Sequence, residues 1–432
     1  MDKYFHSVRL NTDKCLGCMN CIKRCPTEAI RVRKGKAKMI HERCIDCGEC
    51  IRVCPHHAKY AERESLTTIV NFKYRIAVPA PALYGQFSNV DDINIILNAL
   101  KRMGFDEVAE VSKGAELVSH ATRKLMAAGA LKKPVISSAC PVVCRLIRIS
   151  FPELIPNVVN LNAPFEEAAK LAREKAMKET GLASEDIGVF FITPCPAKIT
   201  AIKQPLFSEK SNLDGAVAIS DIYTVMLQQM KKVTEIENIQ QSGRIGVGWA
   251  VSGGEASALL LDNSLHVDGI ENVMKILEEI EDEKLNNVDF VELNACTEGC
   301  VGGCLTAENP YIAKNRLQSL KKYLPVACNR IGDDDVPEDM YWDKPLEELP
   351  VMRLSGNIVD AMRMMNDIKE IQKMLPNLDC GTCGAPSCKA LAEDVVKGYA
   401  SVNDCMFLLR KQFDEKDMEN LVPAPFQKKT EE

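Results

Sequence analysis

The sequence has no long apolar run, no basic stretch and no apolar leader. These absences argue against a membrane-spanning, a secreted and a nucleic-acid-binding protein. No uncharged apolar segment approaches the ~20 residues that a helix needs to cross a bilayer. The start, MDKYFHSVRL, lacks the apolar core of a secretory signal. Lysines and arginines do not gather with interleaved aromatics, and the formal net charge is -6, so a nucleic-acid backbone finds no matching surface. We therefore predict a cytoplasmic protein with no membrane span and no nucleic-acid partner.

Cysteine, in contrast, is abundant, with 19 in a chain of 432 residues. A chain of this length can form two or three domains with at least one substantial core. The cytoplasm keeps thiols reduced, and the cysteine spacings are too tight and too regular for disulfides that staple loops. We therefore predict that most of the cysteines are metal ligands.

Composition divides the chain into a cysteine-dense start, an α/β middle, a polar and proline-marked linker, and a helical end with more cysteines. The predicted limits are 1–66, 67–330, 331–354 and 355–432, the last including the charged tail QKKTEE. In the middle region VDDINIILNALKRM has a helical stripe of apolar residues, whereas IGVFFITP, RIGVGWAV and NVDFVELNA resemble buried strands. The predicted fold is an α/β domain preceded by an α+β module and followed by a small helical module.

The first module contains a repeat, CLGCMNCIKRCP and CIDCGECIRVCP, with the same spacing C-x2-C-x2-C-x3-C-P. This spacing is typical of bacterial ferredoxins, in which the fourth cysteine of each run serves the other [4Fe-4S] cluster. Zinc sites also use C-x2-C, but they rarely add the third cysteine and the proline. The module therefore resembles a two-cluster ferredoxin domain that passes electrons. One predicted ligand set is Cys15, Cys18, Cys21 and Cys54, and the other is Cys44, Cys47, Cys50 and Cys25.

In the middle region, cysteines follow predicted strands. Cys140 comes after the run 135–138, Cys195 ends VFFITPC, and Cys296 ends FVELNAC with Cys300 four residues later. Ligands of open α/β sheets gather at the carboxyl ends of strands, so we expect these four cysteines to converge on one cluster. The alternative is four separate buried cysteines that act as small apolar side chains.

The motifs SSACP, TPCPAK and C-x3-C-x2-G stand in the order of the signature motifs of [FeFe]-hydrogenases, usually written TSCCP, MPC-x-x-K and C-x-x-G-C-x-x-G. The chain resembles that family from about residue 72 to 328. The resemblance implies that the four cysteines bind a [4Fe-4S] cluster and that Cys300 also bridges to a diiron subsite with CO, cyanide and azadithiolate. It further implies that Lys198 anchors a cyanide, that Pro81 and Ala82 line the cofactor pocket, and that maturation proteins build the subsite.

The sequence departs from this family where its proton relay begins. Ala139 stands in place of the first cysteine of TSCCP, and a methyl group has no proton to give. The two glutamates that continue the relay in the family fall at Ala121 and Thr122. Glu255 and Glu292 offer an alternative carboxylate route, although each glutamate could simply be hydrogen-bonded to backbone. Kept cluster ligands without the relay resemble the sensory type of this family.

A last cysteine cluster has the spacing C-x2-C-x4-C-x16-C. It resembles the small [4Fe-4S] domain of corrinoid iron-sulfur proteins and electron-transfer complexes, with zinc as the alternative. Its position suggests an electron exit or a redox-dependent contact. The predicted ligands are Cys380, Cys383, Cys388 and Cys405.

Together these features predict a slow [FeFe]-hydrogenase that interconverts H2 with protons and electrons and acts as an H2 or redox sensor. Its predicted cofactors are four [4Fe-4S] clusters and one diiron subsite, and its predicted partner is a separate ferredoxin-like or other redox or signalling protein. The alternatives are a non-catalytic hydrogenase-like iron-sulfur scaffold and a plain electron-transfer protein. Lys198 and the glycines after Cys300 favour the first reading, because they suit a bulky anionic group.

Overall fold

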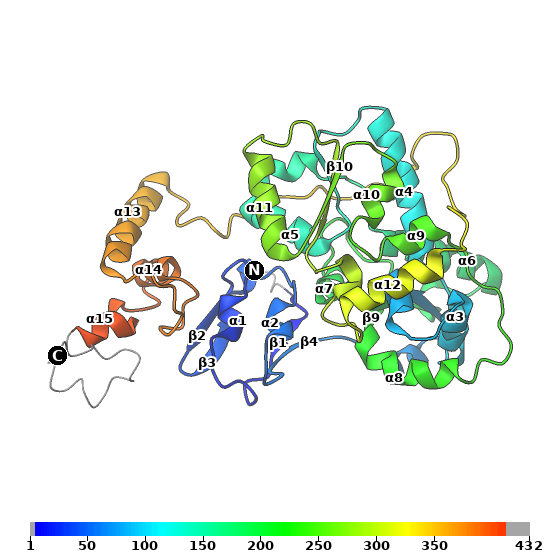
Figure 1. The fold of residues 1–432 in the computed structure, drawn as a ribbon, viewed down its shortest axis with the longest axis horizontal. Helices are drawn as coiled ribbons and strands as arrows, with labels where there is room; N and C mark the ends of the chain where they lie inside the picture. The colour runs from blue at the N-terminus through cyan, green and yellow to red at the C-terminus, as the bar shows by residue number, and fades with distance from the viewer. Residues whose placement is uncertain (1–4, 412–432) are drawn as a thin grey trace. The chain divides into compact units, whose positions relative to one another are not determined.

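The computed structural model describes residues 5–411, which form two compact units (Figure 1). Of these residues, the larger unit takes 5–9, 45–48 and 60–350, and the second unit takes 10–44, 49–59 and 351–411. The second unit therefore contains both most of the ferredoxin-like repeat and the C-terminal cysteines. The four sequence-based limits follow modules along the chain and stay a prediction, and the QKKTEE tail lies outside the described residues.

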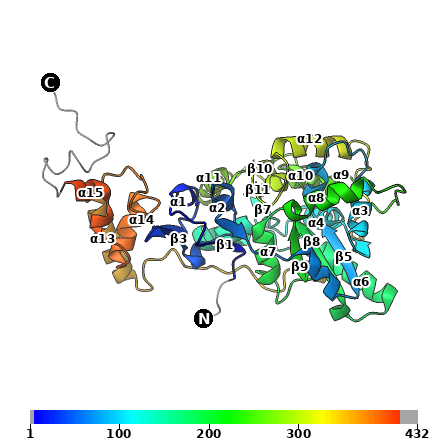
Figure 2. The same cartoon turned by 90° about the horizontal axis from the view of Figure 1, so that it is seen from below.

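The larger unit contains a four-stranded parallel sheet in which β5, β8 and β9 lie side by side (Figure 2). Every residue of β8 is buried, as expected for an apolar run inside a parallel sheet. The sheet order is β6 (Glu107–Val108), β5 (Tyr74–Pro79), β8 (Ile187–Thr193) and β9 (Gly215–Ala218).

A second parallel sheet has three strands, in the order β10 (Ser264–Asp268), β11 (Phe290–Asn294) and β7 (Val135–Ile136). Phe290 lies opposite Val135, so the chain leaves β7 and β11 at the same edge. The strands that precede the predicted cluster cysteines therefore belong to two sheets, since β8 is part of the other one.

Helices pack around both sheets and supply much of the core. The apolar stripe predicted for VDDINIILNALKRM forms α3 (Ile93–Arg102), with Ile96, Leu97 and Leu100 fully buried. The Asp92 side chain caps this helix by accepting a hydrogen bond from Asn94 N. The other helices are α4 (Val111–Ala127), α5 (Pro141–Ser150), α6 (Pro164–Thr180), α7 (Pro196–Lys203), α8 (Ile219–Met230), α9 (Arg244–Gly248), α10 (Gly254–Leu259), α11 (Ile270–Glu281) and α12 (Pro310–Lys321).

The strand predicted for RIGVGWAV is wrong, because this stretch forms α9 and the turn that leads into α10. A Cβ on Gly246 would lie 2.1 Å from the backbone oxygen of Ser112 in α4, so glycine lets the two helices touch. A Cβ on Gly254 would lie 2.0 Å from the oxygen of Gly248. A short buried apolar run does not reveal its period, and these glycine contacts are the reason for the helical outcome.

The second unit combines a β-hairpin, short helices and a helical C-terminal part. Arg31 lies opposite Lys38 in the antiparallel hairpin. Around the C-terminal cysteines, Ile368, Ala385 and Leu391 form a small core, which agrees with the predicted helical module. The elements are β2 (Ile30–Arg33), β3 (Lys36–Met39), α1 (Asn20–Lys23), α2 (Glu49–Arg52), α13 (Ile358–Met374), α14 (Cys388–Val396) and α15 (Met406–Arg410).

A further small sheet pairs β1 (Val8–Leu10) with β4 (Lys59–Ala61). Within residues 5–411, no helix combines the length and the apolar composition needed to cross a membrane.

Candidate functional site

One pocket of the larger unit is lined by all four cysteines predicted for the central cluster. Cys140 and Cys195 are the residues that precede α5 and α7, and each is followed by a proline in the first helical turn. Cys296 follows β11, and Cys300 lies in the 3-10 turn Gly299–Gly302. Two helix starts, one strand end and one tight turn thus bring the four cysteines to one pocket.

The loop that carries Cys300 is built on close backbone contacts. Gly299 has a φ of +82°, and a Cβ there would lie 2.6 Å from Ser252 N. A Cβ on Gly303 would lie 2.3 Å from the oxygen of Pro194, directly before Cys195. These glycines are the reason why the loop can close over the pocket. Four thiols in such a cradle fit a [4Fe-4S] cluster, which prefers four cysteine ligands.

Lys198 points its ammonium group at the cysteines. Its Nζ lies 3.5 Å from Cys300 Sγ and 5.9 Å from the ring centres of both Phe165 and Phe191. Burial alone lowers the pKa of Lys198, but the charges of Cys300, Cys195 and Cys140 outweigh it and raise the pKa. Among residues 5–411 no carboxylate pairs with this lysine, so the buried cation fits an anionic group beside the cysteines.

Ala139 and Pro81 line the same pocket, as the sequence predicted. Ala82 does not: it is fully buried in the 3-10 helix Pro81–Gln86, and Ala80 lines the pocket in its place. The alanine before Cys140 therefore turns a methyl group toward the site where the family has a thiol.

Glu255 and Glu292 also line this pocket, and both are buried. Ser137 Oγ donates a hydrogen bond of 2.5 Å to Glu255 Oε2 and accepts one from Ala139 N. Glu292 instead accepts hydrogen bonds from Gly253 N (3.0 Å), Ala256 N (2.8 Å) and Asn294 Nδ2 (2.7 Å). The backbone contacts expected of a purely structural glutamate are thus present at Glu292, within a wall of the pocket.

The two carboxyl groups differ in their protonation. Burial raises the pKa of Glu255 to about 8, the charge of Glu292 adds to this rise, and the Ser137 hydroxyl opposes it. Burial also raises the pKa of Glu292, against three hydrogen bonds that favour its charged form. Glu292 has more donors, so we assign the negative charge to Glu292 and the proton to Glu255 at neutral pH.

Replacing Glu255 by glutamine should make stability less dependent on pH. The folded protein keeps the Glu255 proton up to about pH 8, whereas the unfolded chain loses it near the ordinary value of 4.5. Between these values the wild type loses stability as pH rises, because the unfolded state releases the proton first. We expect the difference in thermal midpoint, E255Q minus wild type, to increase as the pH rises from about 5 to about 8.

Exposed Glu235 provides the control for this experiment. E235Q should follow the wild type at every pH. A constant difference between E255Q and the wild type would contradict the raised pKa of Glu255.

Sequence reasoning missed several residues of this pocket and left three cysteines unassigned. Trp249, which lines the pocket, was missed, and so was Ser137, which stands inside the motif SSACP and contacts Glu255 of the pocket wall. Cys144 is buried and donates to the oxygen of Ser138, so its role is in the core. Cys304 Sγ would lie 2.3 Å from a Cβ on Gly48, and Cys328 is exposed.

In the second unit, one small pocket is lined by the first predicted N-terminal set, Cys15, Cys18, Cys21 and Cys54. Ala37 N donates to Cys15 Sγ (3.4 Å), and Ala58 N donates to Cys54 Sγ (3.3 Å). Such N–H to sulfur contacts are among the factors that set cluster potentials. In the other predicted set, Cys25 Sγ accepts a hydrogen bond from Ala29 N (3.2 Å), and the grouping of its four cysteines stays a prediction.

The C-terminal cysteines gather around one loop. Cys383, Cys388 and Cys405 belong to the core of the helical module. Burial raises the pKa of Cys383, and the charges of Cys380 and Cys405 add to the rise. Gly381 and Gly384, with φ of +81° and +78°, supply the left-handed turns of the loop.

Comparison with known proteins agrees with this arrangement. Residues 73–263 and 260–304 match the model for "iron only hydrogenase large subunit, C-terminal domain", residues 7–55 match a 4Fe-4S dicluster domain, and residues 375–407 match a Fe-S cluster domain described as putative. The dicluster match favours iron over zinc at the N-terminal cysteines. The chain is thus an [FeFe]-hydrogenase-like iron-sulfur protein with a ferredoxin-like N-terminal module.

Individual relatives are more distant. The periplasmic [Fe] hydrogenase large subunit of Nitratidesulfovibrio vulgaris is 30% identical over 45% of this chain and 50% of its own length. The NADP-reducing hydrogenase subunit HndD of Solidesulfovibrio fructosivorans is 23% identical over 34% of this chain and 25% of its own. The chain therefore spans half or less of the length of these two relatives.

A solved [FeFe]-hydrogenase, described in connection with oxygen inactivation of the H cluster 2Fe subcluster, aligns with a TM-score of 0.50 and 18% identity. The alignment covers 60% of this chain and 90% of that one, and it supports the fold alone. The hydrogenase model, by contrast, matches more than half of the 432 residues. On that ground the chain belongs to the family of the iron-only hydrogenase large subunit, C-terminal domain.

Proposed function

We propose that this protein is a slow [FeFe]-hydrogenase that senses H2 or redox state and reports through its iron-sulfur clusters. One observation carries the proposal: Ala139 replaces the relay thiol in a pocket that keeps its four cysteines and the buried Lys198. Burying the Lys198 ammonium group without a carboxylate partner costs free energy, and an anionic ligand of a diiron subsite would offset that cost. The non-catalytic scaffold is therefore the weaker alternative.

The proposed ligands follow from the pocket lining. Cys140, Cys195, Cys296 and Cys300 would hold a [4Fe-4S] cluster, and Cys300 would be shared with a diiron subsite carrying CO, cyanide and azadithiolate. When bound, that subsite supplies the place where H2 is cleaved or formed. Lys198 would orient an anionic ligand through a charge-assisted hydrogen bond. The apolar side chains of Ala139 and Pro81 would exclude water around it.

Glu255 and Glu292 are the proposed proton carriers. Glu255 holds a proton on a buried carboxyl group, in contact with Ser137 Oγ, and Glu292 is the neighbouring charged acceptor. His266 lies opposite Glu292 in the β10–β11 ladder and is exposed, so it gives this route an end at solvent. A route through two buried glutamates in place of a thiol suits slow exchange with solvent.

The proposed electron path uses the other clusters. We assign one [4Fe-4S] cluster to each of the four cysteine sets, and we expect a ferredoxin-like or signalling protein in the cytoplasm to accept the signal. Maturation proteins would supply the diiron subsite. We propose that the N-terminal cysteines bind clusters and that this module transfers electrons. Both roles rest on the ferredoxin spacing of these cysteines.

Infrared spectroscopy on matured protein tests the proposal. We expect CO and cyanide bands that change when H2 is admitted, together with H2 turnover at least 10²-fold below that of relay-intact family members, because a positioned acid or base contributes ~10² to 10⁴-fold in rate. Absence of the bands would favour the scaffold, and turnover as fast as that of relay-intact members would contradict the sensory role.

A further inference from the structure

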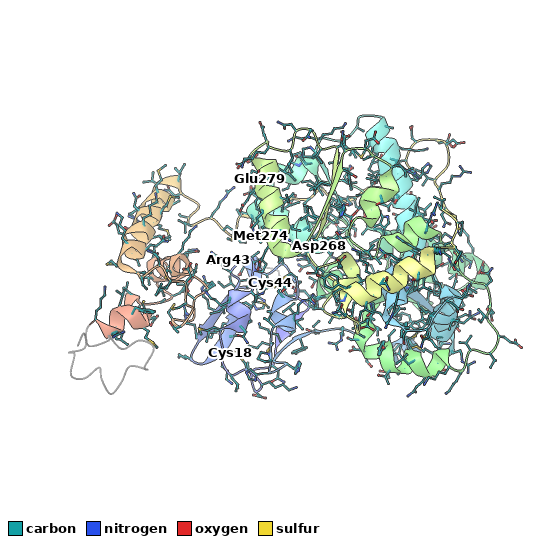
Figure 3. The ribbon with its side chains drawn as sticks, viewed as in Figure 1. Cys18, Arg43, Cys44, Asp268, Met274 and Glu279 are labelled. Carbon is teal, nitrogen blue, oxygen red and sulfur yellow. The ribbon has the colours of Figure 1, made fainter. Side chains whose placement is uncertain are left out.

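The second unit contains a buried ion-pair cluster between the ferredoxin-like hairpin and the C-terminal module. Asp394 on α14 is 5% exposed, and its Oδ2 accepts hydrogen bonds from Arg31 Nε (2.7 Å) and Arg33 Nη2 (2.6 Å) of β2. Glu393, the neighbouring residue, pairs with Arg43, which is labelled in Figure 3. Buried charges are stable only when they are paired, so this cluster fixes how α14 lies against β2.

Backbone contacts fix the cysteine loop in the same place. Val32 N donates a hydrogen bond of 2.8 Å to the oxygen of Gly384, and Arg33 Nη1 donates one of 3.2 Å to the oxygen of Cys383. A Cβ on Gly384 would lie 2.0 Å from the oxygen of Val32, so only glycine allows this approach. The loop between Cys380 and Cys388 therefore continues the edge of the hairpin.

The same loop touches the residues next to the first N-terminal cysteine set. A Cβ on Gly381 would lie 3.4 Å from Met19 Sδ and 3.5 Å from Ile22 Cδ1. Gly381 follows Cys380, while Met19 and Ile22 follow Cys18 and Cys21. Residues next to the two cysteine sets are thus in contact at α1 (Asn20–Lys23), where Lys23 Nζ also donates a hydrogen bond of 3.2 Å to the oxygen of Pro386.

We propose that the C-terminal cluster exchanges electrons directly with the cluster held by Cys15, Cys18, Cys21 and Cys54, and that Asp394 with Arg31 and Arg33 is the clamp that positions them. In each step one electron leaves the N-terminal cluster, which is oxidised, and enters the C-terminal cluster, which is reduced. No proton moves and no bond changes. The source of the electrons rests on the proposed function, whereas the positioning does not.

The clamp also places a positive charge beside the C-terminal cysteine loop. Arg33 Nη1 donates a hydrogen bond to the carbonyl oxygen of Cys383. A fixed positive charge favours the more negative, reduced form of a neighbouring cluster. Arg33 therefore helps to stabilise the reduced form of the C-terminal cluster.

Electron paramagnetic resonance of the full chain tests the proposal. Dithionite would reduce the clusters without H2, so failure of the hydrogenase proposal would not affect the result. In the wild type we expect spin-spin splitting in the signal of the reduced C-terminal cluster, and this splitting should vanish in D394K, where a lysine faces two arginines. The C-terminal cluster should also become harder to reduce in R33Q.

The control is D360K, which changes a surface ion pair with Arg363 on α13 and should keep the splitting. Iron content shows whether each variant still holds its clusters. If D394K loses iron, R33Q takes its place, because Arg33 lies outside the C-terminal module. Unchanged splitting in D394K with full iron content, or in R33Q where D394K loses iron, would overturn the proposal, and so would the absence of splitting in the fully reduced wild type.

Discussion

Replacing Cys300 by alanine is expected to abolish the CO and cyanide infrared bands of the matured protein. Cys300 is the proposed shared ligand, and its sulfur lies 3.5 Å from the ammonium group of Lys198. Without this sulfur the diiron subsite would have no covalent link to the chain, and no other cysteine follows in the Gly299–Gly302 turn to replace it. Infrared spectra of wild type and C300A, matured side by side, check the expectation.

The exposed Cys328 provides a matched control, since C328A removes a thiol outside the pocket and should leave the bands intact. K198A should give a weaker effect, because a charge-assisted hydrogen bond contributes only about 1.5 to 3 kcal/mol. We expect shifted or partly lost bands in that variant. Full bands in C300A would show that Cys300 is not the bridging ligand.

Glu292→Gln is expected to lower the residual H2 activity by an order of magnitude or more, within the ~10² to 10⁴-fold range of a positioned acid or base. Glutamine keeps the size of the side chain and removes the carboxylate. The measurement is H2 uptake and evolution, with the infrared spectrum recorded on the same sample. Nearly unchanged bands would assign the loss to proton movement and not to a damaged pocket.

Two comparisons sharpen this test. The amide group that E292Q introduces would turn one donor toward the backbone donors Gly253 N and Ala256 N, whereas E255Q meets only the rotatable Ser137 hydroxyl and is the less disruptive change. A139C should raise activity only slightly, because Ala121 and Thr122 offer no carboxylate to carry the proton further. Full activity in both glutamine variants would rule out the carboxylate route.

The sequence predicted correctly those elements whose conformation depends on neighbouring residues in the chain. The stripe of α3 and the apolar run of β8 follow from periodicity and composition, and spacing alone grouped Cys54 with the first three N-terminal cysteines. The strand prediction for RIGVGWAV was wrong because this stretch packs against the backbone of Ser112 in another helix, a contact that the local sequence does not reveal. Ala82 lies outside the pocket lining while its neighbours Ala80 and Pro81 belong to it, because the backbone turn decides which side chain faces the pocket, and the cofactor role of Ala82 stays a prediction.

The docking of the C-terminal module had no sequence signal at all. Asp394 lies more than 360 residues from both arginines of its clamp, and each residue alone resembles an ordinary surface charge. Likewise, the residues around Ser137 and Glu255 in the sequence do not indicate that these two side chains form a hydrogen bond. Long-range polar contacts of this kind depend on the completed fold, and for that reason they were found only in the structure.

Backbone hydrogen bonds and buried strands support the walls of the cysteine pocket. Leu305 N donates to the oxygen of Pro194, Val301 N donates to the oxygen of Ala250, and the strands behind them are fully buried. In small zinc domains the metal supplies the folding free energy, whereas here the apolar core of the larger unit does so. The positions of the four sulfur atoms therefore depend on the apolar core of the larger unit, and a substitution in that core would change how well the four thiols match one cluster.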